Sequence, residues 1–134
     1  MHTFPWYIKY FANQVLKKEA IPVLLSPTPE FSFVDGKIAK TNKYQEYMKA
    51  VSDELKILYI DYYSYIANNM ESVGEDNIKQ NKWFPIDNVH TSPEAAESNA
   101  KLLINGKKCL NNEDLISILN EEEKDANYPC LNKE

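Results

Sequence analysis

Residues 21–29 read IPVLLSPTP, and this short stretch decides the fold class. The apolar run ends in Ser26, and Pro27 and Pro29 then stop it. A run of this length between turn signals predicts a strand that is buried on both faces, not one with alternating polarity. Strands of that kind occur mainly in parallel sheets, so we expect a parallel sheet that helices cover.

The segments on either side repeat the same alternation. Before the strand, a helix is predicted from Thr3 to about Glu19, with apolar residues at helical spacing, namely Phe4, Ile8, Phe11 and Val15. After it, helical spacing recurs at Tyr44, Met48, Val51 and Leu55, and residues 57–60 form a second predicted strand that ends at Asp61. This order predicts an α/β fold, a three-layer α/β/α sandwich with a parallel sheet. With only about two strands plus flanking helices, the sheet is expected to be incomplete.

Weaker signals describe the middle of the chain. Residues 30–42 lack periodicity and contain Asp35-Gly36, which predicts a loop with a tight turn. A third helix is expected to end at Gly74, and residues 75–82 are interpreted as a polar connector in which one helical turn can form. Asp61, at the end of its strand, is expected to cap the third helix.

The C-terminal part has sharper helix signals. Ser92 is expected to be an N-cap, with Pro93 at the first helical position and Gly106 just past the end of the helix. Beyond Cys109, Asn111 or Asn112 can cap a short helix with Leu115, Ile118 and Leu119 on its apolar side, followed by a polar tail.

Composition limits the classes of function. The chain has 134 residues and a net charge of −5, with scattered lysines. This balance argues against nucleic acid and anionic membranes as partners. No apolar run reaches the length of a membrane span, and the sequence as written begins without the pattern of a signal peptide.

The two cysteines, Cys109 and Cys130, lie close together in the sequence. One local disulfide is the natural pairing, and it would place the protein outside the cytosol. Two free thiols in a cytosolic protein remain the alternative.

Residues 87–90 read DNVH and directly precede the helix that Ser92 caps. An aspartate three residues before a histidine can reach the Nδ1–H of the imidazole, which fixes the tautomer and leaves Nε2 as a general base. Asp87 and His90 are therefore the candidate catalytic residues. The alternative is a surface turn in which Asp87 caps backbone amides and His90 is a bystander. His2 is too far from His90 in the sequence to suggest a metal site, and no metal or other cofactor is expected.

Residues 83–97, WFPIDNVHTSPEAAE, resemble the last sequence block of SGNH (GDSL-like) hydrolases, and most closely that of fungal rhamnogalacturonan acetylesterases. Residues 3–7, 23–29 and 59–65 and the cysteine spacing also resemble this family. The resemblance implies that Asp87 and His90 complete a Ser–His–Asp triad and that Cys109 and Cys130 form a disulfide.

The resemblance further implies how the chain is organised. Residues 1–110 would be the C-terminal part of an SGNH hydrolase domain with a flavodoxin-like sandwich, and residues 111–134 a helix and tail tied back by the disulfide. The family's Gly-Asp-Ser nucleophile block and its oxyanion-hole Gly and Asn are not found. Ser26 is interpreted as structural, since Pro27 follows it and no sharp elbow activates it. This polypeptide alone is therefore expected to be inert.

The expected function is that of a carboxylic ester hydrolase that deacetylates plant cell-wall polysaccharide. The full-length protein is expected to be extracellular and monomeric, with acetylated polysaccharide as its partner. Candidate substrate contacts are Trp83, Phe84, Phe33 and Phe31, and packing in the core or at its rim is the alternative for each. The competing hypotheses are a catalytically inactive SGNH-fold binding or scaffold protein, a truncated gene product, and a cytosolic α/β domain in which Asp-x-x-His is a coincidence.

Overall fold

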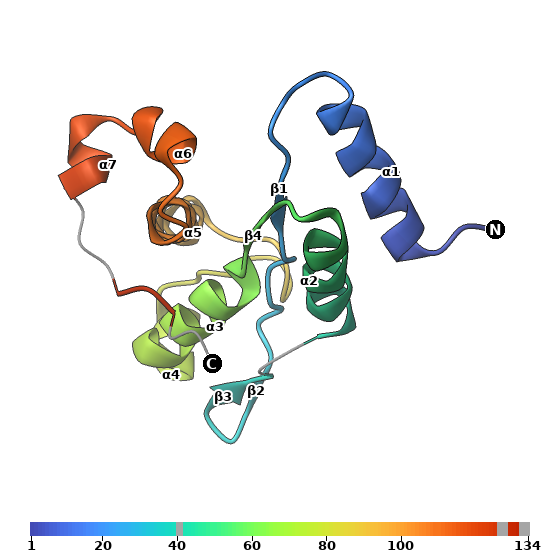
Figure 1. The fold of residues 1–134 in the computed structure, drawn as a ribbon. Coiled ribbons are helices and arrows are strands. Elements are labelled where there is room, and N and C mark those ends of the chain that lie inside the picture. Colours follow the sequence, from blue (N-terminus) through green and yellow to red (C-terminus); the bar gives the residue numbers. More distant parts are fainter. Residues whose placement is uncertain (40–41, 126–128, 132–134) are drawn as a thin grey trace.

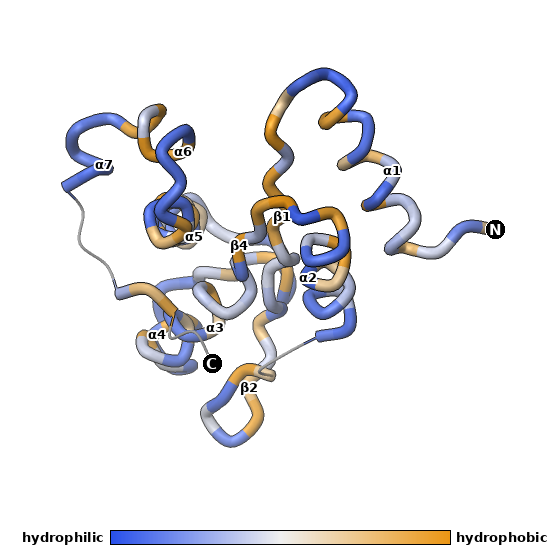
Figure 2. The backbone as a smooth tube through the Cα atoms, in the orientation of Figure 1, coloured by the Kyte–Doolittle hydropathy of each residue, from blue (hydrophilic) through white to orange (hydrophobic). Residues whose placement is uncertain are grey.

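The structure is a computed structural model that describes residues 1–39, 42–125 and 129–131. Two parallel strands lie at the centre of the molecule (Figure 1). Strand β1 (Val23–Leu25) pairs with β4 (Leu58–Ile60), with Leu24 opposite Tyr59. Both strands coincide with the predicted apolar runs, and Figure 2 shows hydrophobic residues along them. In the described part of the chain this sheet has two strands, as expected.

Helices cover the strand pair on both sides, which confirms the α/β fold class. Helix α2 (Lys43–Leu55) connects β1 to β4 and packs on both, and α1 (Phe4–Leu16) lies beside α2. On the other side, α5 (Pro93–Cys109) contacts β4 and packs against α3 (Tyr62–Val73) (Figure 1). The remaining elements are β2 (Phe33–Val34), β3 (Lys37–Ile38), α4 (Glu75–Gln80), α6 (Glu113–Ser117) and α7 (Glu121–Asp125).

Side-chain caps begin the helices where the sequence places them. The Asp61 carboxylate accepts a hydrogen bond from the Ser64 amide at the start of α3, and the Ser92 hydroxyl accepts one from the Ala95 amide at the start of α5. Each cap pairs an amide that has no partner inside its own helix. Both predicted caps are therefore confirmed.

Three local predictions differ from the structure. The predicted tight turn at Asp35-Gly36 is confirmed, with positive φ at both residues, but it joins the antiparallel strands β2 and β3 where an irregular loop was expected. Such φ values are those of a two-residue hairpin turn. Residues 75–80 form the six-residue helix α4, which is longer than the single helical turn expected in this connector, and α1 ends at Leu16 instead of about Glu19.

Gly106 lies inside α5 and not past its end, which is a further correction. A Cβ built on Gly106 would stand 2.6 Å from Cγ2 of Ile60. The glycine therefore allows α5 to approach β4 closely, and the helix continues for almost another turn to Cys109.

The hydrophobic core is centred on α3. Met70 and Ile78 are almost completely buried, and they belong to a cluster with Ile38, Tyr63, Ile66, Ala67, Trp83 and Ala95. Residues from α3, α4, β3, the loop before α5 and α5 itself thus share one core.

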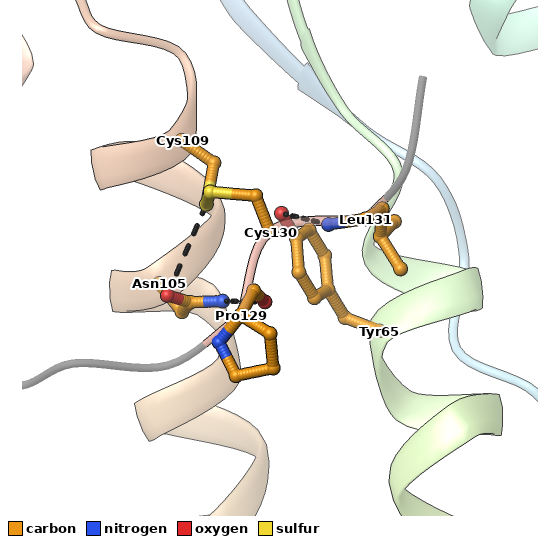
Figure 3. Close-up of a disulfide and its surroundings, with 6 residues drawn as sticks. All are labelled: Tyr65, Asn105, Cys109, Pro129, Cys130 and Leu131. Atoms are coloured by element: carbon orange, nitrogen blue, oxygen red, sulfur yellow. Dashed lines mark hydrogen bonds between the residues drawn. A yellow bond between two sulfur atoms is a disulfide. The ribbon is translucent and has the colours of Figure 1, made fainter. Parts of the chain in front are cut away.

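The C-terminal segment is attached to this side of the molecule (Figure 3). Cys109 and Cys130 form a disulfide with Cα atoms 5.7 Å apart, which confirms the predicted pairing. The Asn105 amide donates a hydrogen bond to the Pro129 carbonyl at 3.0 Å, and the Leu131 amide donates one to the Tyr65 hydroxyl at 3.4 Å. The disulfide and one hydrogen bond therefore attach the tail to α5, and a second hydrogen bond attaches it to α3.

Candidate active site

The candidate residues lie on a loop, residues 83–92, whose two ends are joined. The Ser92 amide donates a hydrogen bond to the Trp83 carbonyl at 2.7 Å, and the Trp83 amide donates one to the Ile78 carbonyl at 3.1 Å. The Trp83 side chain is only 7% exposed, and its Nε1–H points to Glu94 Oε1 at 3.3 Å. The base of the loop is thus part of the core.

A second loop supports the first one from the side. Phe31 and Phe84 stack with ring centroids 5.2 Å apart, and Phe33 meets Phe31 edge-on. The Phe31 amide donates a hydrogen bond to the Asn88 carbonyl at 2.8 Å. The Phe31–Asn88 hydrogen bond therefore joins two loops that are far apart in the sequence, at a point next to Asp87.

The predicted pair is formed. His90 Nδ1 lies 2.7 Å from Asp87 Oδ2, while Asp87 Oδ1 accepts hydrogen bonds from the amides of Val89 and His90, each at 2.8 Å. One carboxylate oxygen of Asp87 therefore caps the turn and the other pairs with the imidazole, while a catalytic role for the two residues stays a prediction.

Electrostatics keep Asp87 ionised at neutral pH. The pKa of Asp87 is lowered to about 2, first by the hydrogen bond from the His90 amide, then by that from the Val89 amide, and then by the His90 side chain. An ionised Asp87 favours the tautomer with the proton on Nδ1 of His90. Nε2 of His90 has no hydrogen bond to any residue that the structure describes, and the His90 side chain is 74% exposed.

A cavity of about 90 Å³ is lined by Val89 and Thr91, on either side of His90, whereas Asp87 and His90 themselves are not among its lining residues. Its other walls come from the loop after β1, from α3, from the loop before α5 and from α5, namely Thr28, Pro29, Ile66, Met70, Trp83, Phe84, Ala95 and Asn99. Of the candidate substrate contacts, Trp83 belongs to the core, and Phe84, Phe33 and Phe31 pack against it; Trp83 and Phe84 also line the cavity.

Ser26 has a structural position, as interpreted from the sequence. It is buried, and its hydroxyl accepts a hydrogen bond from the Tyr63 amide at 2.7 Å and donates to Asp61 at 3.3 Å. Asp61 also accepts from Gln45 and Ser64. This network joins the carboxyl ends of both strands and the first turn of α3.

The described residues form neither a cluster of metal ligands nor a membrane-spanning helix. Within ranges 1–39, 42–125 and 129–131, no three or more His, Cys, Asp or Glu side chains converge as metal ligands would. The described part of the chain also has no helix with the length and apolarity needed to cross a bilayer.

Neither a protein-family model nor a curated protein gives a match to this chain. Among solved structures, the X-ray crystal structure of protein YxiM from Bacillus subtilis has a similar fold, with a TM-score of 0.75 and 20% sequence identity over 82% of this chain. The match covers 32% of the YxiM chain, so the present chain spans about a third of that protein's length. At this identity the similarity shows the fold alone, an α/β arrangement with a small parallel sheet between helices.

Proposed function

We propose that this chain supplies the acid and the base of a Ser–His–Asp carboxylic ester hydrolase that deacetylates plant cell-wall polysaccharide, as its resemblance to SGNH hydrolases implies. The observation that carries the proposal is the 2.7 Å contact between His90 Nδ1 and Asp87 Oδ2, with the opposite ring nitrogen facing solvent. A serine from another polypeptide segment would be the nucleophile.

The chemistry follows from this geometry. Asp87 orients the imidazole and stabilises the imidazolium, while Nε2 of His90 takes the proton of the serine hydroxyl as its oxygen attacks the ester carbonyl. Nε2 then gives this proton to the sugar oxygen as the acetyl–oxygen bond breaks. A water molecule releases acetate by the reverse proton path. Ionised Asp87 is required throughout, and its lowered pKa supplies this state.

The cavity suits a small acyl group. Its volume of about 90 Å³ is far below the roughly 300–1,000 Å³ of pockets that enclose drug-sized ligands. A polysaccharide would therefore lie across the exposed surface of the loop, with only an acetyl group entering beside Trp83 and Phe84. The disulfide supports an oxidising compartment, and we place the full-length enzyme outside the cell.

The test starts with the DNA on the 5′ side of the Met1 codon. If the reading frame continues there through a Gly-Asp-Ser block, the extended polypeptide should release acetate from acetylated rhamnogalacturonan. Asp87→Asn should lower kcat by about 10⁴, because the imidazole then adopts the wrong tautomer. The matched control is Asp76→Asn on α4, an exposed aspartate outside the site, which should leave kcat unchanged.

The competing function is that of an inactive binding or scaffold protein. The exposure of His90, with no hydrogen bond from Nε2 to a described residue, favours it over a self-sufficient enzyme. A folded extended polypeptide that binds the polysaccharide without releasing acetate would establish this alternative and refute the hydrolase.

A further inference from the structure

Helix α1 is apolar on most of its circumference but buries very little. Of its 13 residues only Ala12 is buried. The exposed large side chains on this helix are Phe4, Trp6, Tyr7, Tyr10, Phe11 and Leu16, and Phe11 reaches 62% exposure. A helix with apolar residues all round is normally enclosed by protein. Helix α1 therefore exposes an apolar surface that another polypeptide segment would normally cover.

One flank of α1 packs on α2, whereas on the other flank His2, just before the helix, stacks on Trp6 with ring centroids 3.6 Å apart. Toward α2, Phe4 packs edge-on against Tyr44, and Lys9 pairs with Glu54. Elsewhere, Trp6 and Tyr10 stack with centroids 5.4 Å apart and line an open groove of about 320 Å³ along the same helix, together with Lys9, Asn13, Gln14 and Lys17. Figure 1 shows α1 at the outside of the molecule, with α2 alone beside it.

The neighbouring strand is open as well. Strand β1 pairs with β4 on one edge, and in the described part of the chain no strand pairs with its other edge. The Ser26 amide donates to the Ile60 carbonyl. Because alternate amides of a strand face the same neighbour, those of Val23 and Leu25 face the open edge. An apolar edge strand of this kind is a template for adding another strand.

We propose that the open edge of β1 and the exposed face of α1 form one docking surface for a second α/β polypeptide segment, which adds a strand beside β1 and packs on α1. The inference rests on the proposed function, because the same segment would bring the nucleophile to His90.

Two observations select this occupant. A strand–helix unit is the one structure that satisfies a strand edge and an apolar helix face together. In addition, the similarity to YxiM covers 82% of this chain but 32% of the other, so about two thirds of the YxiM chain lies outside the matched fold. A second copy of this chain is the alternative occupant.

The first measurement uses the 134-residue chain alone. Light scattering should report a monomer at micromolar concentration, and the dye ANS should bind with enhanced fluorescence. The double variant Tyr10→Glu and Phe11→Glu should lose at least half of this fluorescence, whereas the control Ile118→Glu, at a still more exposed residue directly after α6, should not. A dimer that the double variant dissociates would overturn the proposal in favour of a second copy.

The second measurement uses the extended polypeptide, or the chain co-expressed with the product of an adjoining reading frame. Hydrogen exchange at the Leu25 amide should slow at least tenfold relative to the isolated chain, and the double variant should restore fast exchange, with circular dichroism to confirm that it folds. The proposal is overturned if adjoining DNA encodes no strand–helix units, or if Leu25 exchanges equally fast in both forms. Protection of Leu25 without acetate release refutes the esterase alone, and acetate release without protection refutes the docking surface alone.

Discussion

Helices α3 and α1 have similar lengths, and α1 has the more aromatic sequence, with five aromatic residues against three, but the two helices differ in what they bury. Helix α3 buries five of its 12 residues, and α1 buries one of 13. The difference comes from their neighbours, since α4, α5, β3 and the disulfide-linked tail surround α3, whereas α1 leans on α2 alone. Apolar content therefore does not set burial, because each apolar face also needs another element to pack on.

We call the part of the molecule around α3, α4 and α5 the closed side, and α1 with the unpaired edge of β1 the open side. The candidate active site is anchored to the closed side. The closed side holds the loop through Trp83 in the core, and the pair at its tip points out to solvent. This arrangement would let a partner approach a preformed Asp87–His90 pair without rearranging the core. Four measurements can sharpen or break the contrast between the closed side and the open side.

The largest expected effect is on the closed side. Met70→Ala removes a side chain that is only 1% exposed and leaves a cavity, which should lower the free energy of unfolding by about 2–5 kcal/mol. The matched change on the open side, Phe11→Ala, should alter it by no more than about 0.5 kcal/mol. Urea unfolding followed by circular dichroism measures both. Equal losses would mean that α1 is buried in solution, and the contrast would fail.

The disulfide should contribute nearly as much. Replacing Cys109 and Cys130 together by serine releases a loop closed over 21 residues, and should lower the free energy of unfolding by about 3 kcal/mol on the chain-entropy account. Wild-type protein unfolded with a reductant present should show the same loss. An unchanged urea midpoint would show that the disulfide-linked tail does not stabilise the packing around α3.

A smaller loss is expected from Gly106→Ala, since the new methyl group would overlap Cγ2 of Ile60. Overpacking costs about 1–3 kcal/mol, and the gain in helix propensity returns up to about 1 kcal/mol, so a net loss of about 1 kcal/mol is expected. In an Ile60→Ala background the same substitution should cost less, because the opposing methyl is gone. A double-mutant cycle on urea midpoints tests this, and an equal cost in both backgrounds would place the strain elsewhere.

Gly106 also shows which features of the fold could not be predicted from the sequence. The strands, the caps at Asp61 and Ser92 and the Asp87–His90 contact could be predicted because each depends on residues within a few positions of one another. A glycine near a helix end reads locally as a stop signal, and only its distant neighbour Ile60 explains why α5 continues. The stacking of Phe31 on Phe84 was equally invisible, since it joins two loops.

The smallest expected effect concerns Asp87, and it tests whether the closed side alone orders the site. Its pKa in the folded chain is about 2, below the ordinary value of 3.8, so the carboxylate's contribution to stability is complete above pH 3.8 and is lost as the pH falls through about 2. Because Asp87 is exposed, the global effect should be slight, and the readout is local. In NMR titration of the isolated chain, the Asp87 carboxyl and the amides of Val89 and His90 should titrate together near pH 2, and Asp87→Asn should abolish the amide response. A midpoint near pH 3.8 would mean that the hydrogen bonds to Asp87 form only when a partner is bound. In that case the burial of Trp83 in the core does not by itself preform the Asp87–His90 pair.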